Sequence, residues 1–483
     1  MTISSTTLPV AVIGAGPVGL AAAAHLAERR LDFVVLEAGT QPGSSISQWG
    51  HVRVFSPWRY NIDTAARRLL DPTGWAAPEP HLLPTGADLV TDYLQPLAKL
   101  SAIAPQLRYH ARVVAIGRLG VDRVRSRGRQ DAPFVIRLAN GDEVLARAVI
   151  DASGTWTRPN ALGASGLPAY GEGDIGYAVE QALPDVLGAD RTRFAGSRVL
   201  VVGAGHSAAN TLLSLADLAT QEPGATVYWA IRAATASRAY GGGDNDALPA
   251  RGALGTRLHA HVEAGRITLL TGFSVHTVRA AVGGGAVEVV SLDVNGGRRS
   301  VTVDRIVSAT GFRPDHTIST ELRLDLDPIM ESPRALAPLI DPNQHSCGTV
   351  PPHGADHLAH PEPGFYTVGM KSYGRAPTFL MATGYEQVRS VVAALAGDWE
   401  AARDVQLELP ETGVCSSDLA LGEGEGEAGS QGGCCGPAPA VRADGRGLAT
   451  GMAGGLLAVP LPLVAIGTQS DPDTGTTGGG CCG

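Results

Sequence analysis

Hydrophobic and polar residues along the first 400 positions alternate in blocks that predict strands followed by helices. Residues 10–39, VAVIGAGPVGLAAAAHLAERRLDFVVLEAG, read as an apolar strand, a glycine turn, an alanine-rich helix and a second apolar strand. Residues 196–218, GSRVLVVGAGHSAANTLLSLADL, repeat the strand, the turn and the helix. Continuous apolar strands that alternate with helices are typical of parallel sheets. The pattern therefore predicts an α/β fold with two doubly wound, Rossmann-like domains.

The first glycine turn predicts a site for the ADP half of a dinucleotide. Gly14 permits the tight turn, Gly16 lets a pyrophosphate approach the backbone, and Gly19 lets the helix pack closely on the strand. The helix N-terminus offers free N–H groups and the positive end of its dipole to the phosphates. Glu37 ends the second strand, where a carboxylate accepts hydrogen bonds from ribose hydroxyls. The residues predicted to bind here are Gly14, Gly16, Pro17, Gly19 and Glu37.

The second glycine turn predicts a second dinucleotide site. The strand after it is followed by Arg232 where the first site has an acid, and a guanidinium suits the 2′-phosphate of NADPH. An ordinary solvated arginine is the alternative for Arg232, and Arg238 is a rival for the phosphate. Two dinucleotide sites in one chain indicate FAD in the first and NADPH in the second. The residues predicted to bind NADPH are Gly203, Gly205, Ser207, Ala208 and Arg232.

Three later or intervening stretches extend the pattern. Residues 149–160 and 306–315 are strands that end in small residues and glycine, as expected where a chain leaves one domain beside a cofactor. Residues 364–397 read as a strand, a loop and an amphipathic helix that can close over a flavin. Residues 49–63 hold candidate flavin or substrate neighbours, for which a packed loop is the alternative. These neighbours are Arg53, Ser56 and Trp58.

The order of these motifs resembles the flavoproteins with two dinucleotide-binding domains, and among them the flavin-containing monooxygenases and their bacterial relatives. The stretches WGHVRVFSPWRYNID, GMKSYGRAPTFL and LPETGVCSSDL are similar to the flavoprotein encoded beside bacterial arsenic-resistance genes. The resemblance covers about residues 8–400. It implies an FAD-binding domain formed by residues 1–164 and 305–400, with an NADPH-binding domain, residues 165–304, inserted into it.

The same resemblance implies further cofactor-binding residues and an activity. The activity is that of an NADPH-dependent FAD oxidoreductase, monooxygenase-like and linked to arsenic resistance, which acts on oxygen or a small-molecule substrate. The residues at the two crossings between the domains and beside the flavin are Val113, Ala152, Ser153, Gly154, Ala309, Thr310, Gly311, Gly369, Met370 and Lys371.

The sequence departs from these relatives in two ways. Monooxygenases of this type carry an FxGxxxH segment before the second turn, and the corresponding residues 162–181 contain neither that phenylalanine nor that histidine. Disulfide reductases of the same fold need a cysteine pair beside the flavin, and no cysteine precedes Cys347. A redox disulfide in the core is therefore excluded. The alternatives are an NADPH oxidase or reductase that passes electrons to tail thiols, and a thiol-rich metalloid-binding protein on a flavin scaffold.

The C-terminal residues 401–483 form a Gly/Cys-rich tail that we expect to be mostly disordered. The tail holds 19 glycines and ten Asp and Glu against three Lys and Arg, a composition that buries little surface. Adjacent cysteines present two soft sulfur ligands, which suit trivalent arsenic. A neutral low-complexity extension is the alternative. The predicted metalloid ligands are Cys434, Cys435, Cys481 and Cys482.

Charge and composition limit the partners and the location. The net charge is −9, of which the tail supplies −7, so no basic surface for nucleic acid is predicted. No secretory signal precedes the first strand, which favours the cytoplasm. Residues 448–467 are apolar over about the length of a membrane span, but their glycines and prolines favour a tail segment instead. A homodimer is compatible with the sequence.

Overall fold

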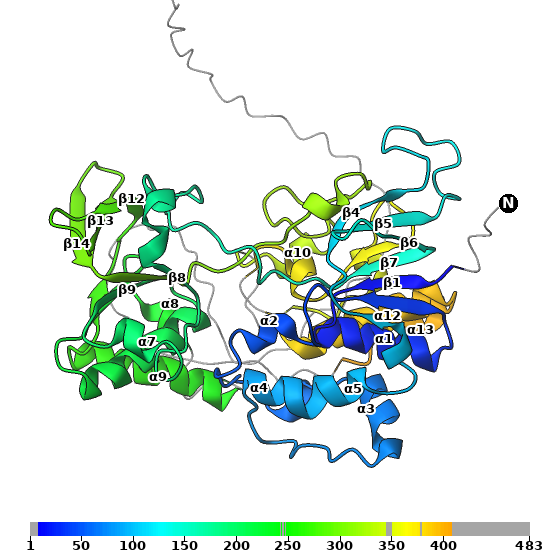
Figure 1. The fold of residues 1–483 in the computed structure, drawn as a ribbon, viewed down its shortest axis with the longest axis horizontal. Helices are drawn as coiled ribbons and strands as arrows, with labels where there is room; N and C mark the ends of the chain where they lie inside the picture. Colours follow the sequence, from blue (N-terminus) through cyan, green and yellow to red (C-terminus); the bar gives the residue numbers. More distant parts are fainter. Residues whose placement is uncertain are drawn as a thin grey trace, which may run out of the picture. The chain divides into compact units, whose positions relative to one another are not determined.

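The structure is a computed structural model that describes residues 8–241, 243, 246, 248–343, 350–376 and 379–407. These residues contain two five-stranded parallel sheets and two three-stranded antiparallel sheets (Figure 1). Each parallel sheet packs helices on one face and an antiparallel sheet on the other. The predicted α/β fold with parallel nucleotide-binding sheets is confirmed.

The first parallel sheet has the strand order β16-β7-β1-β2-β3. The strand bounds are β1 Val10–Ile13, β2 Phe33–Leu36, β3 Leu107–Arg108, β7 Ala148–Asp151 and β16 Phe365–Thr367. Every residue of β1, β2, β7 and β16 is buried, because the sheet is covered on both faces. The covering antiparallel sheet consists of β4 Val113–Arg118, β5 Phe134–Leu138 and β6 Glu143–Ala146.

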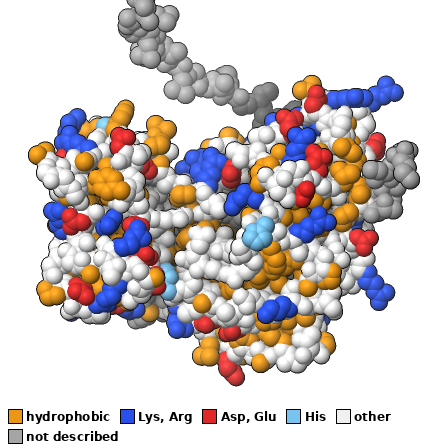
Figure 2. Space-filling view, viewed as in Figure 1, with side chains coloured by type: hydrophobic (Ala, Val, Ile, Leu, Met, Phe, Trp, Pro, Cys, Tyr) orange, Lys and Arg blue, Asp and Glu red, His pale blue; other side chains and the backbone are white. Residues whose placement is uncertain are grey.

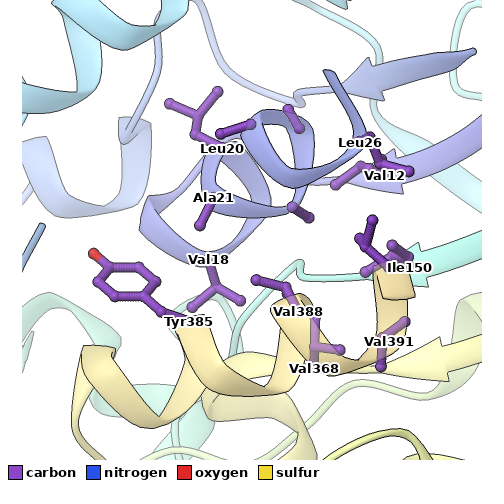
Figure 3. Close-up of a cluster of buried hydrophobic side chains, with 14 of the residues drawn as sticks. Val12, Val18, Leu20, Ala21, Leu26, Ile150, Val368, Tyr385, Val388 and Val391 are labelled. Atoms are coloured by element: carbon purple, nitrogen blue, oxygen red, sulfur yellow. The ribbon is translucent and has the colours of Figure 1, made fainter. Parts of the chain in front are cut away.

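Helices α1 and α12 cover the other face of the first sheet. Helix α1, Pro17–Glu28, and helix α12, Met381–Leu395, lie against each other over Val18, Val388 and Val391 (Figure 3). The small side chains of α1 allow this approach, and a Cβ on Gly384 of α12 would lie 2.6 Å from Val18. The C-terminal part of the described chain thus packs directly on the helix that follows the first glycine turn.

The second parallel sheet has the strand order β11-β10-β9-β15-β8. Its helical face is formed by α7 and α9, and its other face packs on β12, β13 and β14. The bounds are β8 Val179–Gln181, β9 Arg198–Val202, α7 His206–Gln221, β10 Thr226–Ala230, α9 Pro249–Glu263, β11 Thr268–Leu270, β12 Val275–Ala280, β13 Val287–Leu292, β14 Arg298–Val303 and β15 Arg305–Ser308.

Two segments connect the parallel sheets. The chain leaves β7 through residues 152–160 and returns from β15 through residues 309–315. The two segments pair where Pro159 bridges Phe312 and where the Asn160 N–H donates to the Gly311 carbonyl at 2.9 Å. All strands of the second sheet lie between β7 and β16 along the chain, as an inserted domain requires. The domain boundaries given above stay predictions.

Shorter helices lie between and after these elements, and the label η marks a 3₁₀ or π helix. They are α2 Ser44–Ser47, η2 Trp58–Tyr60, α3 Thr64–Leu70, η3 Asp71–Thr73, α4 Gly86–Asp88, η4 Leu89–Leu94, α5 Gln95–Ala98, η5 Ala104–Gln106, η6 Glu172–Ala178, α6 Arg191–Phe194, α8 Ser237–Tyr240, η8 Thr317–Ser319, α10 Ala337–Ile340, α11 Ala355–Leu358, η9 Gly369–Tyr373 and α13 Trp399–Arg403. Within the described ranges, no helix has the length and apolar character that a membrane crossing needs. The apolar residues 448–467 lie outside those ranges.

Candidate functional site: two nucleotide cradles and their crossings

The first glycine turn follows β1 and leads into α1. Gly14 has a φ of +95°, and a Cβ on it would lie 2.8 Å from the carbonyl oxygen of Ala152. A Cβ on Gly19 would lie 2.0 Å from the carbonyl oxygen of Gly14. Packing therefore requires both glycines. At Gly16, by contrast, an added Cβ would meet no heavy atom of the described residues within 4 Å, so this glycine leaves open space before α1.

The start of α1 fits a dinucleotide phosphate. Pro17 is the first helical residue, and its fixed φ suits that place. Gly16 stands at the N-cap, where no side chain accepts a hydrogen bond from the first turn. The first-turn N–H groups are therefore left for a ligand, and the open space at Gly16 admits one to the backbone. This arrangement fits the FAD pyrophosphate expected from the sequence.

Glu37 is buried at the end of β2 and organises the same turn. Its Oε2 atom accepts a hydrogen bond from the Ala15 N–H at 2.7 Å, and its Oε1 atom accepts one from the Gly39 N–H at 2.7 Å. Each carboxylate oxygen can accept a second hydrogen bond, so ribose hydroxyls still find acceptors here. Burial, followed by the Glu37 charge, raises the pKa of the nearby Tyr109. Sequence reasoning missed this tyrosine, which carries no motif.

Residues 364–397, which are predicted to close over the flavin and are called the closing segment below, lie on the first turn of α1. A Cβ on Gly369 would lie 3.3 Å from Val18, and the Gly369 N–H donates to Gln387 Oε1 at 2.7 Å. Met370 is half-buried, whereas Lys371 is fully buried. The Lys371 ammonium donates to the Asp151 carboxylate and to the Ser153 hydroxyl. The closing segment therefore contacts the outgoing crossing, which is the segment of residues 152–160 through which the chain leaves β7.

The outgoing crossing contains Ala152, Ser153 and Gly154. Gly154 has a φ of +73°, a left-handed conformation that favours glycine. Ala152 and Ser153 pack directly on Gly14, because a Cβ on that glycine would be 3.3 Å from Ser153 Cα. These predicted residues therefore lie beside the first glycine turn.

The second glycine turn repeats the geometry of the first. Gly203 has a φ of +134°, and a Cβ on it would lie 2.1 Å from the carbonyl oxygen of Ala309. A Cβ on Gly205 would meet no described heavy atom within 4 Å. Ser207 and Ala208 lie in the first turn of α7, where Ala208 is fully buried. Open space before α7 again fits a phosphate, here that of NADPH.

The returning crossing lies beside this second turn. The Thr310 hydroxyl donates to the Asn160 carbonyl at 2.8 Å, and the Asn160 side-chain amide donates to the Thr310 carbonyl at 3.1 Å. Gly311 has a φ of +89°. Ala309 supplies the carbonyl on which Gly203 packs. Each glycine turn is therefore fixed against one crossing segment.

An aromatic and charged cluster covers the start of α7. The ring centroids of Phe55 and His206 lie 4.9 Å apart. Arg251 is buried and pairs with the buried carboxylate of Asp246 at 2.6 Å, and its guanidinium lies 6.0 Å from the Phe55 centroid. Burial, and then the Arg251 charge, lower the pKa of His206. The members of this cluster come from three separate segments, so no single sequence motif contains them.

The predicted 2′-phosphate ligand lies just past β10. Arg232 is exposed, and its guanidinium donates to the Ala164 carbonyl at 2.9 Å. Its rival Arg238 is also exposed, in α8. Both guanidinium groups are accessible to a ligand, and the geometry does not separate them.

The candidate neighbours in residues 49–63 all contact other residues of the chain. Arg53 donates to the Leu83 carbonyl at 2.5 Å, and the Ser56 hydroxyl donates to Asn61 Oδ1 at 2.8 Å. Trp58 belongs to the hydrophobic core. The packed-loop alternative describes these three residues, whereas the intervening Phe55 contacts the second glycine turn.

An open surface pocket of about 520 Å³ lies between residues 47–51 and residues 180–190. Trp156 of the outgoing crossing lines it, and its indole N–H donates to Gln48 Oε1 at 2.8 Å. The Trp156 ring lies 4.8 Å from that of Phe312 and 6.5 Å from that of Trp49. This volume falls in the range of small-molecule sites in proteins.

The remaining predicted residues lie elsewhere or outside the described ranges. Val113 begins β4 and packs on the core between β1 and β5, near Ala111, whose N–H donates to the Glu37 carbonyl at 2.8 Å. Cys434, Cys435, Cys481 and Cys482 lie outside the described residues. Among the described residues, no group of three or more histidine, cysteine or acidic side chains could hold a metal. Positive and negative side chains are interspersed on the face shown in Figure 2, without one extended basic surface.

Comparison with known proteins gives ferredoxin–NADP reductases as relatives in sequence, and the similar solved structures include reductases and monooxygenases. The ferredoxin–NADP reductase of Gluconobacter oxydans is 27% identical over 322 residues, which cover 65% of this chain and 76% of the relative. A bacillithiol disulfide reductase from Staphylococcus aureus superimposes with a TM-score of 0.57 at 16% identity, over 81% of this chain and 98% of that chain. A flavin-containing monooxygenase from Stenotrophomonas maltophilia gives a TM-score of 0.51 at 19% identity, over 81% and 98%. The two structures support the fold.

Residues 8–330 match the sequence pattern of one family, described as pyridine nucleotide-disulphide oxidoreductase. The match covers more than half of the chain and includes both glycine turns and both crossings. The predicted enzyme class and cofactors, an oxidoreductase that uses FAD and NADPH, are confirmed. The chain belongs to the pyridine nucleotide-disulphide oxidoreductase family.

Proposed function

We propose that the protein is an NADPH-dependent, monooxygenase-like flavoenzyme linked to arsenic resistance. The observation that carries this proposal is the position of the cysteines. Residues 1–346 contain none, so no disulfide within the two nucleotide-binding sheets can take electrons from the flavin. The acceptor must then come from outside these sheets. Oxygen together with a small molecule is the acceptor that we favour.

The residues of the chain prepare such a reaction by holding two cofactors. The turns at Gly14 and Gly203 supply open phosphate cradles, and the crossings keep each cradle in place. Bound FAD supplies hydride acceptance and oxygen chemistry, which the protein's side chains do not provide. The open pocket beside Trp156 is a site for a small-molecule substrate. Its lining residues come from segments that connect to both parallel sheets.

The link to arsenic rests on the resemblance of three sequence stretches and on the tail thiols. Cys434 with Cys435, and Cys481 with Cys482, present vicinal sulfur ligands that suit a thiophilic ion such as trivalent arsenic. We place the reaction in the cytoplasm, where thiols stay reduced. We also keep a homodimer as a prediction.

A reductase is the second candidate, because the curated relatives are ferredoxin–NADP reductases. In that version the electrons of NADPH pass through the flavin to an external carrier or to the tail thiols. An oxidase would convert NADPH, H⁺ and O₂ into NADP⁺ and H₂O₂. A monooxygenase would convert NADPH, H⁺, O₂ and substrate into NADP⁺, H₂O and oxygenated substrate.

The stoichiometry of the purified protein distinguishes these reactions. We expect one O₂ to be consumed for each NADPH oxidised. We also expect trivalent arsenic to lower the amount of peroxide released for each NADPH oxidised. Peroxide equal to NADPH in all conditions indicates the oxidase. NADPH oxidation that needs added ferredoxin and consumes no O₂ indicates the reductase. Truncation after Gly413 removes the tail thiols and leaves both sheets intact, so it tests whether arsenic binding needs the tail. No NADPH oxidation with any acceptor would contradict all three versions.

A further inference from the structure

Lys371 stands out because the chain almost never uses lysine. The sequence has 38 Lys and Arg, of which two are lysines, Lys99 and Lys371, leaving 36 arginines. Lys371 is only 1% exposed, although lysine is among the residues that are rarely fully buried. Lys99 is exposed. At this fully buried position the chain has a compact ammonium group, and a larger guanidinium would need more space.

The Lys371 ammonium completes a closed network of three residues. Its Nζ atom donates to Asp151 Oδ2 at 2.6 Å and to the Ser153 hydroxyl at 3.0 Å. Asp151 Oδ1 in turn accepts hydrogen bonds from the Ser153 N–H at 3.1 Å and from the Ser153 hydroxyl at 2.7 Å. Asp151 is fully buried. Ser153 is thus held from two sides, by a carboxylate and by an ammonium.

The network lies where the first sheet meets the FAD cradle. Asp151 ends β7 and is level with Ile13 of β1 and Thr367 of β16 in the parallel register. Ser153 and Ala152 pack against Gly14, on which a Cβ would lie 3.3 Å from Ser153 Cα. A shift of Ser153 must therefore shift the first glycine turn. The network couples the closing segment, through Lys371, to the phosphate cradle.

Two buried polar atoms beside the network have no hydrogen-bond partner within the described part of the chain. They are the Thr367 hydroxyl, directly opposite Asp151, and His316 Nδ1. Burial and then the Lys371 charge lower the pKa of His316, so the ring lies within reach of that charge. Buried polar atoms normally find a partner in water or a ligand.

We propose that Lys371 is a positioning residue that acts through Ser153 to hold the outgoing crossing against the FAD cradle. Lys371 then affects FAD without contacting it. This inference rests on the FAD site in the first glycine turn and names the residue that keeps that site in its binding form. In this arrangement Asp151, at the carboxyl end of β7, holds both the ammonium and the serine.

The test is a mutational cycle on the full-length, FAD-loaded protein. Ser153→Ala removes the hydroxyl, and Lys371→Met combined with Asp151→Asn removes the ion pair without leaving a buried charge. We expect each change to raise the FAD dissociation constant about tenfold, as for loss of a charge-assisted hydrogen bond. Each should also shift the flavin absorption band and midpoint potential. Combining all three substitutions should raise the dissociation constant by much less than a hundredfold, because both changes break the same contact.

Several outcomes would overturn the inference. Wild-type affinity and potential in Ser153→Ala would do so, as would an additive, hundredfold effect of the combined substitutions. If the ion-pair variant does not fold, Ser153→Ala alone still decides. Lys99→Met is the matched control and should leave affinity, spectrum and potential unchanged. Wild-type protein that binds no FAD would contradict the proposed function itself, which separates that failure from the failure of this inference.

Discussion

Gly16 and Gly205 hold equivalent places in the two glycine turns, and each leaves open space where we expect a cofactor phosphate to bind. Their φ values are −77° and −88°, which any residue adopts. Neither glycine is needed for its backbone conformation, and neither would place a Cβ within 4 Å of a described heavy atom. Gly14, Gly19 and Gly203 differ, because a Cβ on each would collide with the backbone. Only the first pair should therefore affect binding without affecting folding.

Alanine substitutions test this difference. Gly16→Ala should weaken FAD binding at least about tenfold, because the added methyl fills space that the pyrophosphate needs, while the melting temperature of the FAD-free protein stays the same. Gly205→Ala should raise the KM for NADPH and leave FAD affinity unchanged. Gly19→Ala should instead lower the free energy of unfolding by about 1–3 kcal/mol through overpacking. Equal effects of Gly16→Ala and Gly19→Ala on the FAD-free protein would contradict this assignment.

Arg232 and Arg238 allow a paired test of the NADPH preference. Arg232→Ala should raise the KM for NADPH about tenfold to a hundredfold and leave that for NADH nearly unchanged, because a guanidinium–phosphate contact exists only with NADPH. Arg238→Ala is the matched control, and we expect it to change neither constant. If Arg238→Ala gives the selective effect, the phosphate ligand is Arg238. Equal changes for both cofactors would assign the residue to folding.

At the scale of elements, the sequence pattern predicted the features that depend on residues close together in the chain. The buried strands β1, β2 and β9, the glycine turns and the amphipathic helix α12 all follow from apolar runs, glycine positions and helical periodicity. The Asp151–Lys371 pair joins residues 220 positions apart. The Phe55–His206 contact joins a loop between strands of the first parallel sheet to the start of α7, which packs on the second. No short window of sequence contains either pair. Contacts of this kind depend on which elements meet, which the pattern of one segment does not determine.

Glu362 shows how a buried charge fixes elements to one another. Its carboxylate is 1% exposed and pairs with Arg118 of β4 at 2.8 Å and with Arg129 of the following loop at 2.7 Å. It also accepts the Arg323 N–H at 3.0 Å. The antiparallel sheet is thereby joined to the segment that enters β16.

Glu362→Gln should lower the free energy of unfolding by about 3 kcal/mol, because two buried guanidinium groups lose their counter-charge. Urea unfolding of the FAD-loaded protein measures this loss. Glu143→Gln is the matched control, since its pair with Arg137 is exposed and should contribute less than about 1 kcal/mol. Similar losses for the two variants would show that burial does not determine the strength of the Glu362 cluster.

For the whole molecule, we expect buried histidines to contribute to the loss of stability in acid. Burial lowers the pKa of His353 to about 4 and that of His360 to about 4. His353 is only 4% exposed and His360 only 9%. The His353 ring nitrogens contact the Gln387 amide at 2.9 Å and the Pro351 carbonyl at 3.0 Å, a pattern that suits the neutral ring. Burial also lowers the pKa of His206 and His316.

The folded protein should therefore lose stability as the pH falls. In the unfolded chain a histidine binds its proton near pH 6.5, whereas the folded pKa of these two lies lower, so the unfolded state binds more protons between pH 6.5 and about 4. Their stabilisation is complete above pH 6.5 and declines toward pH 4. Lowering the pH from 7.5 to 5.5 should cost about 1 kcal/mol for each of the two rings. Urea unfolding at several pH values measures this slope. The double variant His353→Gln, His360→Gln should give a flatter profile, and an unchanged slope would show that these histidines do not control it.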